Sequence, residues 1–172
     1  MTENVTVLNS EIKNFHIPRW NEIPSIDLYI DQVVSYLDSY LSNYICEDDK
    51  IAGNAITKTM INNYVKHGVI KPPINKKYTK EHLAKLFTIF ILKQIYSIDE
   101  IKKLIQLALK TSSIEQAYDK FCSELEESIK ITFNEDYTIL NKEHLSHEQF
   151  ILRNVVQSFS SKLYVQKVFL KK

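Results

Sequence analysis

Residues 56–105 read ITKTMINNYVKHGVIKPPINKKYTKEHLAKLFTIFILKQIYSIDEIKKLI, and this stretch decides the expected fold. Thr57 can cap a short helix over about 58–67, and Gly68 stands where a helix end needs a left-handed residue. The segment that follows, VIKPPINKKYT, turns at two adjacent prolines and carries three lysines. The stretch therefore predicts a short capped helix, a basic turn and two longer helices.

Apolar residues recur at helical spacing on both sides of this stretch and within it. They predict longer helices over 26–45, 80–95, 98–110, 113–130 and 147–169. Each begins after a residue that can cap it, namely Ser25, Thr79, Ser97, Ser112 and Ser146. The segment HIPRWNEIP should form an extended strap with Trp20 and Ile23 on the core, and residues 46–55 should form a loop.

Length and composition agree with an all-α fold. The chain has 172 residues, enough for one domain with a real core, and only two glycines and four prolines, which argues against a many-stranded β protein and against glycine-rich phosphate loops. We expect a strap at 1–24, a central helical domain at 25–110, and a helical C-terminal region at 111–172 for packing or dimerisation. The last helix is apolar on more than one side, so it calls for two neighbours.

The cysteines and the termini bear on location. Cys46 and Cys122 have no zinc-ligand spacing, which favours two free thiols in a reducing compartment. No signal peptide and no apolar run long enough to span a membrane are visible. We therefore expect a cytoplasmic protein that is not bound to a membrane.

Charge is distributed unevenly along the chain. The net charge is only +1, yet residues 58–85 contain seven lysines and a single acid, Glu81. Residues 1–57 contain nine acids and three basic residues. A dense basic zone in a neutral chain favours an anionic partner, although a solvated lysine face would have the same composition.

The 56–105 stretch resembles the DNA-binding domain of the MerR family. The matching features are the capped short helix, Tyr64 four residues before Gly68, the Val-Ile pair with a nearby proline, the basic turn ending in Tyr78, and the two capped helices that follow. This resemblance implies that residues 25–110 form a MerR-like winged helix-turn-helix domain whose short helix enters the major groove. The wing is shortened to INKKY, and no effector region of the MerR type is recognisable.

Most of the chain also looks like a small bacterial family known as domain of unknown function 1836. That resemblance rests on WNEIPSIDLYIDQV, ITKTMINNYVKHGVIKPP and KKYTKEHLAKL. It implies the same fold and adds little about activity.

A helix-turn-helix needs cations for phosphates and amides or guanidinium groups for base edges. The expected phosphate clamps are Lys58, Lys66, Lys71, Lys76 and Lys77. The expected base readers are Asn62 and Asn63, which stand where MerR proteins usually have Arg and Tyr. An asparagine can bond adenine at two positions, so we expect a preference for A·T-rich double-stranded DNA. One such module buries little surface, which favours a homodimer joined through the last helix.

Other interpretations stay open. The two asparagines can be simple solvent-facing residues, and Tyr64 and Tyr78 fit core packing better than DNA contact. His67 and His82 are expected at the surface. The rival function is a helical protein-interaction module that has lost DNA binding.

His144 and His147, with Glu143 and Glu148, have the spacing of metal ligands but lack a third region, so no metal is expected. No cofactor and no catalytic motif is recognisable, and an enzyme is not expected.

Overall fold

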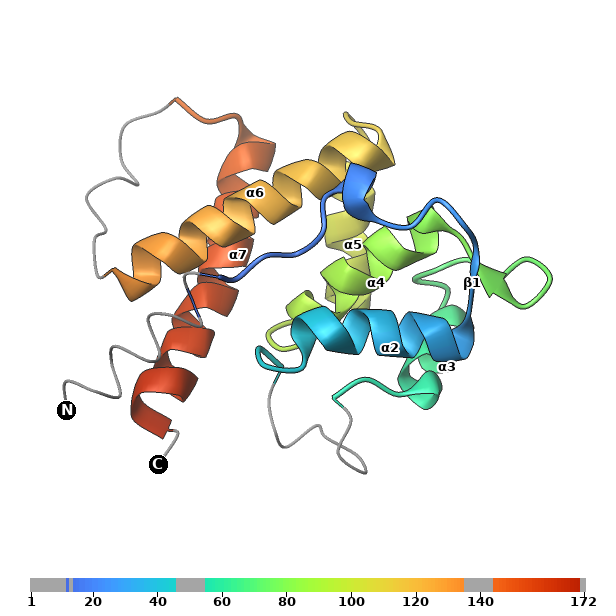
Figure 1. Ribbon diagram of the computed structural model, residues 1–172. Coiled ribbons are helices and arrows are strands. Elements are labelled where there is room, and N and C mark those ends of the chain that lie inside the picture. Colours follow the sequence, from blue (N-terminus) through green and yellow to red (C-terminus); the bar gives the residue numbers. More distant parts are fainter. Residues whose placement is uncertain (1–11, 13, 46–54, 135–143, 171–172) are drawn as a thin grey trace. The chain divides into compact units, whose positions relative to one another are not determined.

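The computed structural model describes residues 12, 14–45, 55–134 and 144–170. They form two compact units, one of residues 17–119 and one of the described residues up to 16 together with those from 120 onward. The chain is mostly helical, with a small two-stranded sheet (Figure 1). The expected helical class is confirmed, with the sheet as an addition.

The first unit contains most of the regular elements. Their bounds are Trp20–Glu22 for a 3-10 turn, Leu28–Tyr29 for β1, Ile30–Leu41 for α2, Lys58–Lys66 for α3, Lys77–Tyr78 for β2, Lys80–Leu92 for α4 and Ile98–Ala108 for α5. Helix α6, Ile114–Phe133, begins in this unit and continues into the other. The expected loop at 46–55 lies, except for its last residue, outside the described residues.

Helix α2 begins at Ile30, four residues later than the sequence pattern predicts. The prediction that Ser25 caps it is wrong, because Leu28 and Tyr29 form β1 instead of a first helical turn. The Tyr29 N–H donates to Oε1 of Gln32 at 2.9 Å, which closes the helix start. Periodicity within one segment cannot reveal this, since the strand exists through pairing with β2, about 50 residues later.

Most other expected helix starts are confirmed. Thr57 and Ser97 accept hydrogen bonds from backbone N–H groups three residues on, as Ser146 does in the second unit. At the start of α6 the prediction was one residue out: Ser113, not Ser112, accepts from the Gln116 N–H at 3.2 Å. The helix ends are less well predicted, since α4 stops at Leu92 and α5 at Ala108.

Helix α4 is the core of the first unit. Most of its residues are buried, including Phe87 and Phe90. Tyr36 of α2 meets Phe87 edge-to-face at 5.8 Å, and Tyr64 of α3 meets Phe90 at 5.4 Å. Each aromatic pair adds about 0.5–1.5 kcal/mol to the burial itself. Both α2 and α3 are therefore anchored on α4 by rings.

Strands β1 and β2 pair antiparallel, Leu28 with Tyr78 and Tyr29 with Lys77. Leu28 and Tyr78 are both buried, as expected for Tyr78, and the neighbouring pair, Tyr29 and Lys77, points to the other face of the sheet. There the Lys77 ammonium lies 5.2 Å from the centre of the Tyr29 ring, a cation–π contact. The sheet thus fixes where Lys77 lies.

The strap before α2 is tied to the start of α6. The Tyr118 hydroxyl donates to the Pro18 carbonyl at 2.8 Å, and the Trp20 N–H donates to Oδ1 of Asp119 at 2.6 Å. Ile23 is buried, as expected, while Trp20 is only half-buried.

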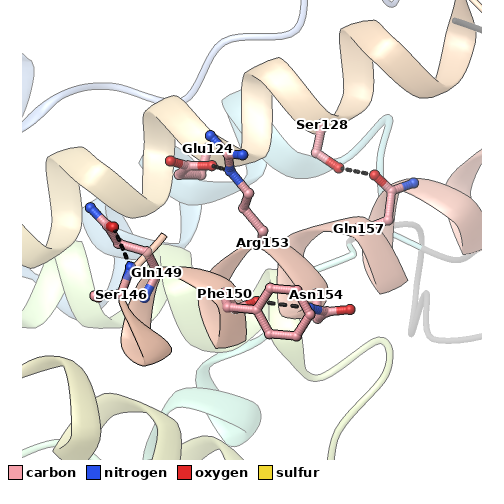
Figure 2. A network of polar contacts seen from close by, with 8 residues as sticks. All are labelled: Glu124, Ser128, Ser146, Gln149, Phe150, Arg153, Asn154 and Gln157. Atoms are coloured by element: carbon pink, nitrogen blue, oxygen red, sulfur yellow. Dashed lines mark hydrogen bonds and ion pairs between the residues drawn. The ribbon is translucent and has the colours of Figure 1, made fainter. Parts of the chain in front are cut away.

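The second unit pairs α6 with α7, His147–Val165, which continues as a π-helical turn over Gln166–Leu170. Figure 2 shows polar contacts between the two helices: Nε of Arg153 reaches Oε2 of Glu124 at 3.2 Å, and Ser128 donates to Gln157 at 3.0 Å. The α7 side chains Val155, Val156, Phe159 and Leu163 are buried, whereas five apolar side chains of α7 and the turn after it are exposed: Phe150, Val165, Val168, Phe169 and Leu170. The expectation of more than one apolar side is confirmed for this segment.

Candidate nucleic-acid interface

Helix α3 is short, capped at both ends and free of acidic residues. Thr57 Oγ1 accepts the Met60 N–H at 3.3 Å, and Gly68, with a φ of 66°, ends the helix. The Gly68 N–H donates to the Val65 carbonyl and the Val69 N–H to that of Tyr64, the two hydrogen bonds of a Schellman motif. Only Ile61 and Tyr64 of α3 are buried, so most of the helix faces solvent.

The outer face of α3, as we use the term, consists of Thr59, Asn62, Asn63 and Lys66, all of them exposed. None of these four side chains makes a hydrogen bond or ion pair to another described residue. Both expected base readers are therefore available to a partner. Exposure is also what the alternative, a simple solvent-facing helix, predicts.

Lys58, the first residue of α3, forms an ion pair. Its Nζ lies 2.5 Å from Oδ1 of Asp31 in α2, and both side chains are more than half exposed. A phosphate would have to compete with Asp31 for this lysine. The sequence pattern did not reveal this ion pair, because Asp31 is 27 positions earlier in the chain.

The start of α2 brings two parts of the candidate site together. Asp31 holds Lys58 of α3, and Tyr29, two residues earlier, holds Lys77 of β2 through its ring. Helix α2 also contacts α3, β1 and β2 (Figure 1). The N-terminal end of α3 and the base of the β2 hairpin are therefore neighbours on one scaffold.

The hairpin that leads into β2 is a tight turn over residues 74–77. Ile74 and Lys77 exchange two backbone hydrogen bonds of 3.0 and 2.9 Å, and Asn75 and Lys76 between them have φ values of 50° and 63°. Two left-handed residues at these positions define a type I′ turn, which favours Asn-Gly. Lys76 occupies the position where glycine is preferred, at a cost of about 1–2 kcal/mol, and its side chain is exposed.

Lys71 lies in the loop between α3 and the hairpin. Its side chain is exposed, but its carbonyl oxygen accepts a hydrogen bond from Nε2 of His82 at 3.1 Å. Because the Thr79 N–H donates to Nδ1 of the same ring at 3.0 Å, the ring proton lies on Nε2. His82 thus ties the loop to the N-terminus of α4.

The expectation that His82 lies at the surface is wrong, whereas His67 is exposed as expected. The His82 side chain is only 6 % exposed. Burial lowers the pKa of His82 below its usual value, which its backbone contacts offset only in part. The imidazole is a structural bridge and is not available to a phosphate.

The sequence pattern did not single out Lys102 of α5. Its Nζ lies 3.7 Å from the position that a Cβ on Gly68 would take, so it sits at the C-terminal end of α3. A cation there is favourable for the helix dipole. Lys58 and Lys102 thus mark the two ends of α3, which is about 13 Å long. Only a fold that packs α5 beside α3 could reveal Lys102.

Two further expectations concern the rest of the chain. Among the described residues, no group of three or more His, Cys, Asp or Glu side chains is placed to hold a metal ion. Glu143, which stands beside His144 in the sequence, is not one of the described residues. Cys122 is buried and is not part of a disulfide bond, and Cys46 lies outside the described residues. The described helices include none with the length and apolar character needed to cross a membrane.

Comparison with known proteins gives a family match. The model of the family described as Domain of unknown function (DUF1836) matches residues 18–121, which include the whole candidate site. The resemblance to this family inferred from the sequence is confirmed. No curated protein and no solved structure matches the chain.

Proposed function

The chain belongs to the DUF1836 family, and we propose that it is a DNA-binding transcriptional regulator that lays α3 into the major groove of A·T-rich duplexes. In this proposal α2 and α3 are the helix pair, and the turn at 74–77 is a short wing of the MerR type. A bacterial member would act in the cytoplasm, where the chromosome lies.

One observation carries the proposal: the outer face of α3 has no acid and has unused hydrogen-bonding groups, and lysines of the following loop, the hairpin and α5 accompany it in the same unit. Lys71 and Lys76 are exposed, Lys77 is held beside the start of α3, and Lys102 lies at its end. Cations at such positions bind phosphates and set register, while exposed amides bond base edges. A helix of this kind at the surface of a small domain fits the major groove.

Salt dependence of DNA affinity tests the proposal. If five lysines neutralise phosphates, a plot of log affinity against log salt should have a slope of about −4.5, and affinity should fall several-hundred-fold between 50 and 200 mM salt. Replacing Lys76 and Lys77 together by Glu should make that slope shallower by about 2. The matched control is Lys120→Glu with Lys130→Glu, which changes the net charge equally on the exposed side of α6.

The measurement is fluorescence anisotropy, or a mobility shift, with A·T-rich and G·C-rich duplexes. We expect the double variant at 76 and 77 to bind far more weakly than the wild type and than the control pair. Equal affinities for all three proteins would contradict the proposal.

A second copy of the chain is part of the proposal, since one small module buries only about 600–1,000 Å² of protein surface on DNA. The candidate contact is the exposed apolar side of α7 and the following turn, where Phe150 is 59 % and Phe169 73 % exposed. Sedimentation of the wild type against Phe150→Glu and Phe169→Glu tests it. We expect a dimer that the substitutions dissociate, and a monomeric wild type would contradict this part.

A rival function, a helical protein-interaction module, is favoured by two observations. Asp31 already neutralises Lys58, and α3 contains no arginine for guanine. Under this alternative the protein has only weak, sequence-independent affinity for DNA, and the outer face of α3 can be changed without effect on binding. The comparison of A·T-rich with G·C-rich duplexes separates the two functions, because only the proposed regulator discriminates between them.

A further inference from the structure

Thr59 lies on the outer face of α3, beside the two asparagines, and we infer that it is a specificity-determining residue whose methyl group contacts the 5-methyl of a thymine. The inference rests on the proposed function and adds a base contact to it. It starts from two structural facts about Thr59: its position on the helix, and the absence of a hydrogen bond from its hydroxyl to another described residue.

The position follows from helical geometry. Residues 59, 62, 63 and 66 are spaced i, i+3, i+4 and i+7, which places them within an arc of about 100° around α3. All four are exposed. Thr59 is the most N-terminal member, in the first turn of the helix, and the N-terminal residues of a helix in the major groove are those that contact base edges.

The second fact concerns the hydroxyl. Elsewhere in the described helices, hydroxyls commonly donate to the carbonyl four residues earlier: Thr88 to Ala84 at 3.1 Å and Thr132 to Ser128 at 2.7 Å. Thr59 cannot do this, because the residue four positions earlier precedes the helix. The capping task belongs to Thr57. The Thr59 hydroxyl therefore makes no hydrogen bond to another described residue.

An exposed β-branched side chain with one methyl and one hydroxyl suits an A·T pair. Its methyl can contact the thymine 5-methyl, while an asparagine one turn further bonds the adenine of a neighbouring pair. Thr59 and Asn62 are separated by about 4.5 Å along the helix axis, close to the base-pair spacing of about 3.4 Å. The two residues would thus select an A–T step together.

Deoxyuridine provides the test, because it lacks only the methyl group of thymine. The probe is the duplex that the wild-type protein selects from a random library, made with deoxyuridine in place of one thymine at a time. At one position we expect the wild type to bind the thymine duplex about fourfold more tightly than its deoxyuridine counterpart, the effect of one methylene-sized apolar contact.

Three variants identify the group responsible. Thr59→Ser removes the methyl and should abolish the preference for thymine at that position; Thr59→Val keeps a methyl and should retain it. Thr111→Ser, at an exposed threonine after α5, is the matched control and should bind as the wild type does. Non-additive effects of the protein and DNA changes measure the contact directly.

The outcomes are distinct. Two results would overturn the inference: a thymine preference that persists unchanged in Thr59→Ser, or no thymine preference at any position of the wild-type site. In either case salt-dependent DNA binding would still support the proposed function. Binding that is independent of both salt and sequence overturns the two together.

Discussion

His82 of α4 hydrogen-bonds to the main chain of Lys71, eleven residues earlier, with 3.1 Å between Nε2 and the carbonyl oxygen. The same ring accepts the Thr79 N–H at the start of α4. One buried side chain therefore holds both ends of the loop that carries the hairpin lysines.

Replacing His82 by Ala should destabilise the protein by about 2–3 kcal/mol. The substitution leaves the Thr79 N–H and the Lys71 carbonyl without their partner and opens a small cavity. His67→Ala, at an exposed histidine, is the matched control and should change the free energy of unfolding by less than about 0.5 kcal/mol. Urea denaturation measures both, and equal effects would contradict the bridging role.

Stability should also depend on pH through His82. Its pKa is lower in the folded protein than the usual value of 6.5, with burial the largest cause. Well above pH 6.5 the His82 ring is neutral in both the folded and the unfolded protein, so the stability that its lowered pKa contributes is fully present. As the pH falls below 6.5, the unfolded chain takes up a proton that the folded ring resists, so the free energy of unfolding decreases until the folded pKa is passed.

The check is urea denaturation at pH 7.5 and pH 5.5 for the wild type and His82→Ala. We expect the wild type to lose more stability than the variant on acidification. A loss of the same size in both proteins would show that other groups cause it.

Asp31→Asn should strengthen DNA binding. The substitution removes the partner of Lys58 and a negative charge near the DNA, which frees the lysine for a phosphate. Exposed ion pairs contribute about 0–1 kcal/mol, so the gain should be at most about fivefold at low salt. Asp27→Asn removes an equal charge from an exposed residue before β1 and is the control. Anisotropy titrations at 50 mM salt should distinguish them; indistinguishable affinities would argue against competition at Lys58.

Lys76→Gly should have opposite effects on stability and on DNA affinity. Glycine adopts the left-handed backbone of residue 76 without strain, so the free energy of unfolding should rise by about 0.5–1 kcal/mol. DNA affinity should fall, and the salt slope should become shallower by about 0.9, because one phosphate contact is lost. Denaturation and anisotropy on the same preparation check both effects. Unchanged DNA affinity would exclude Lys76 from the interface.

Gln157→Ala should destabilise the pairing of α6 with α7 by about 1–3 kcal/mol. Its side chain accepts from Ser128 and donates to Thr132 at 3.0 Å each, and both partners are buried (Figure 2 shows the first contact). Asn154→Ala removes an amide whose partner within the described part of the chain is the Phe150 carbonyl of its own helix, and it should cost much less. Equal losses of thermal stability would contradict this.

The sequence was a good guide wherever the cause of a structure is local. Thr57, Ser97 and Ser146 cap their helices as predicted, because a hydroxyl three residues before a backbone N–H meets it in any helix start. Gly68 ends α3 because the left-handed backbone there favours glycine. The outward position of Asn62 and Asn63 followed from the same periodicity that buries Tyr64.

Tertiary structure decided what depends on segments that are distant in the chain. It converted the expected first turn of α2 into β1, since Leu28 finds its partner in Tyr78. It buried His82, paired Lys58 with Asp31, and brought Lys102 to the end of α3. The physical reason is the range of the interactions: helix caps and periodicity act within a few residues, whereas strand pairing, ion pairs and burial depend on which elements the fold places side by side.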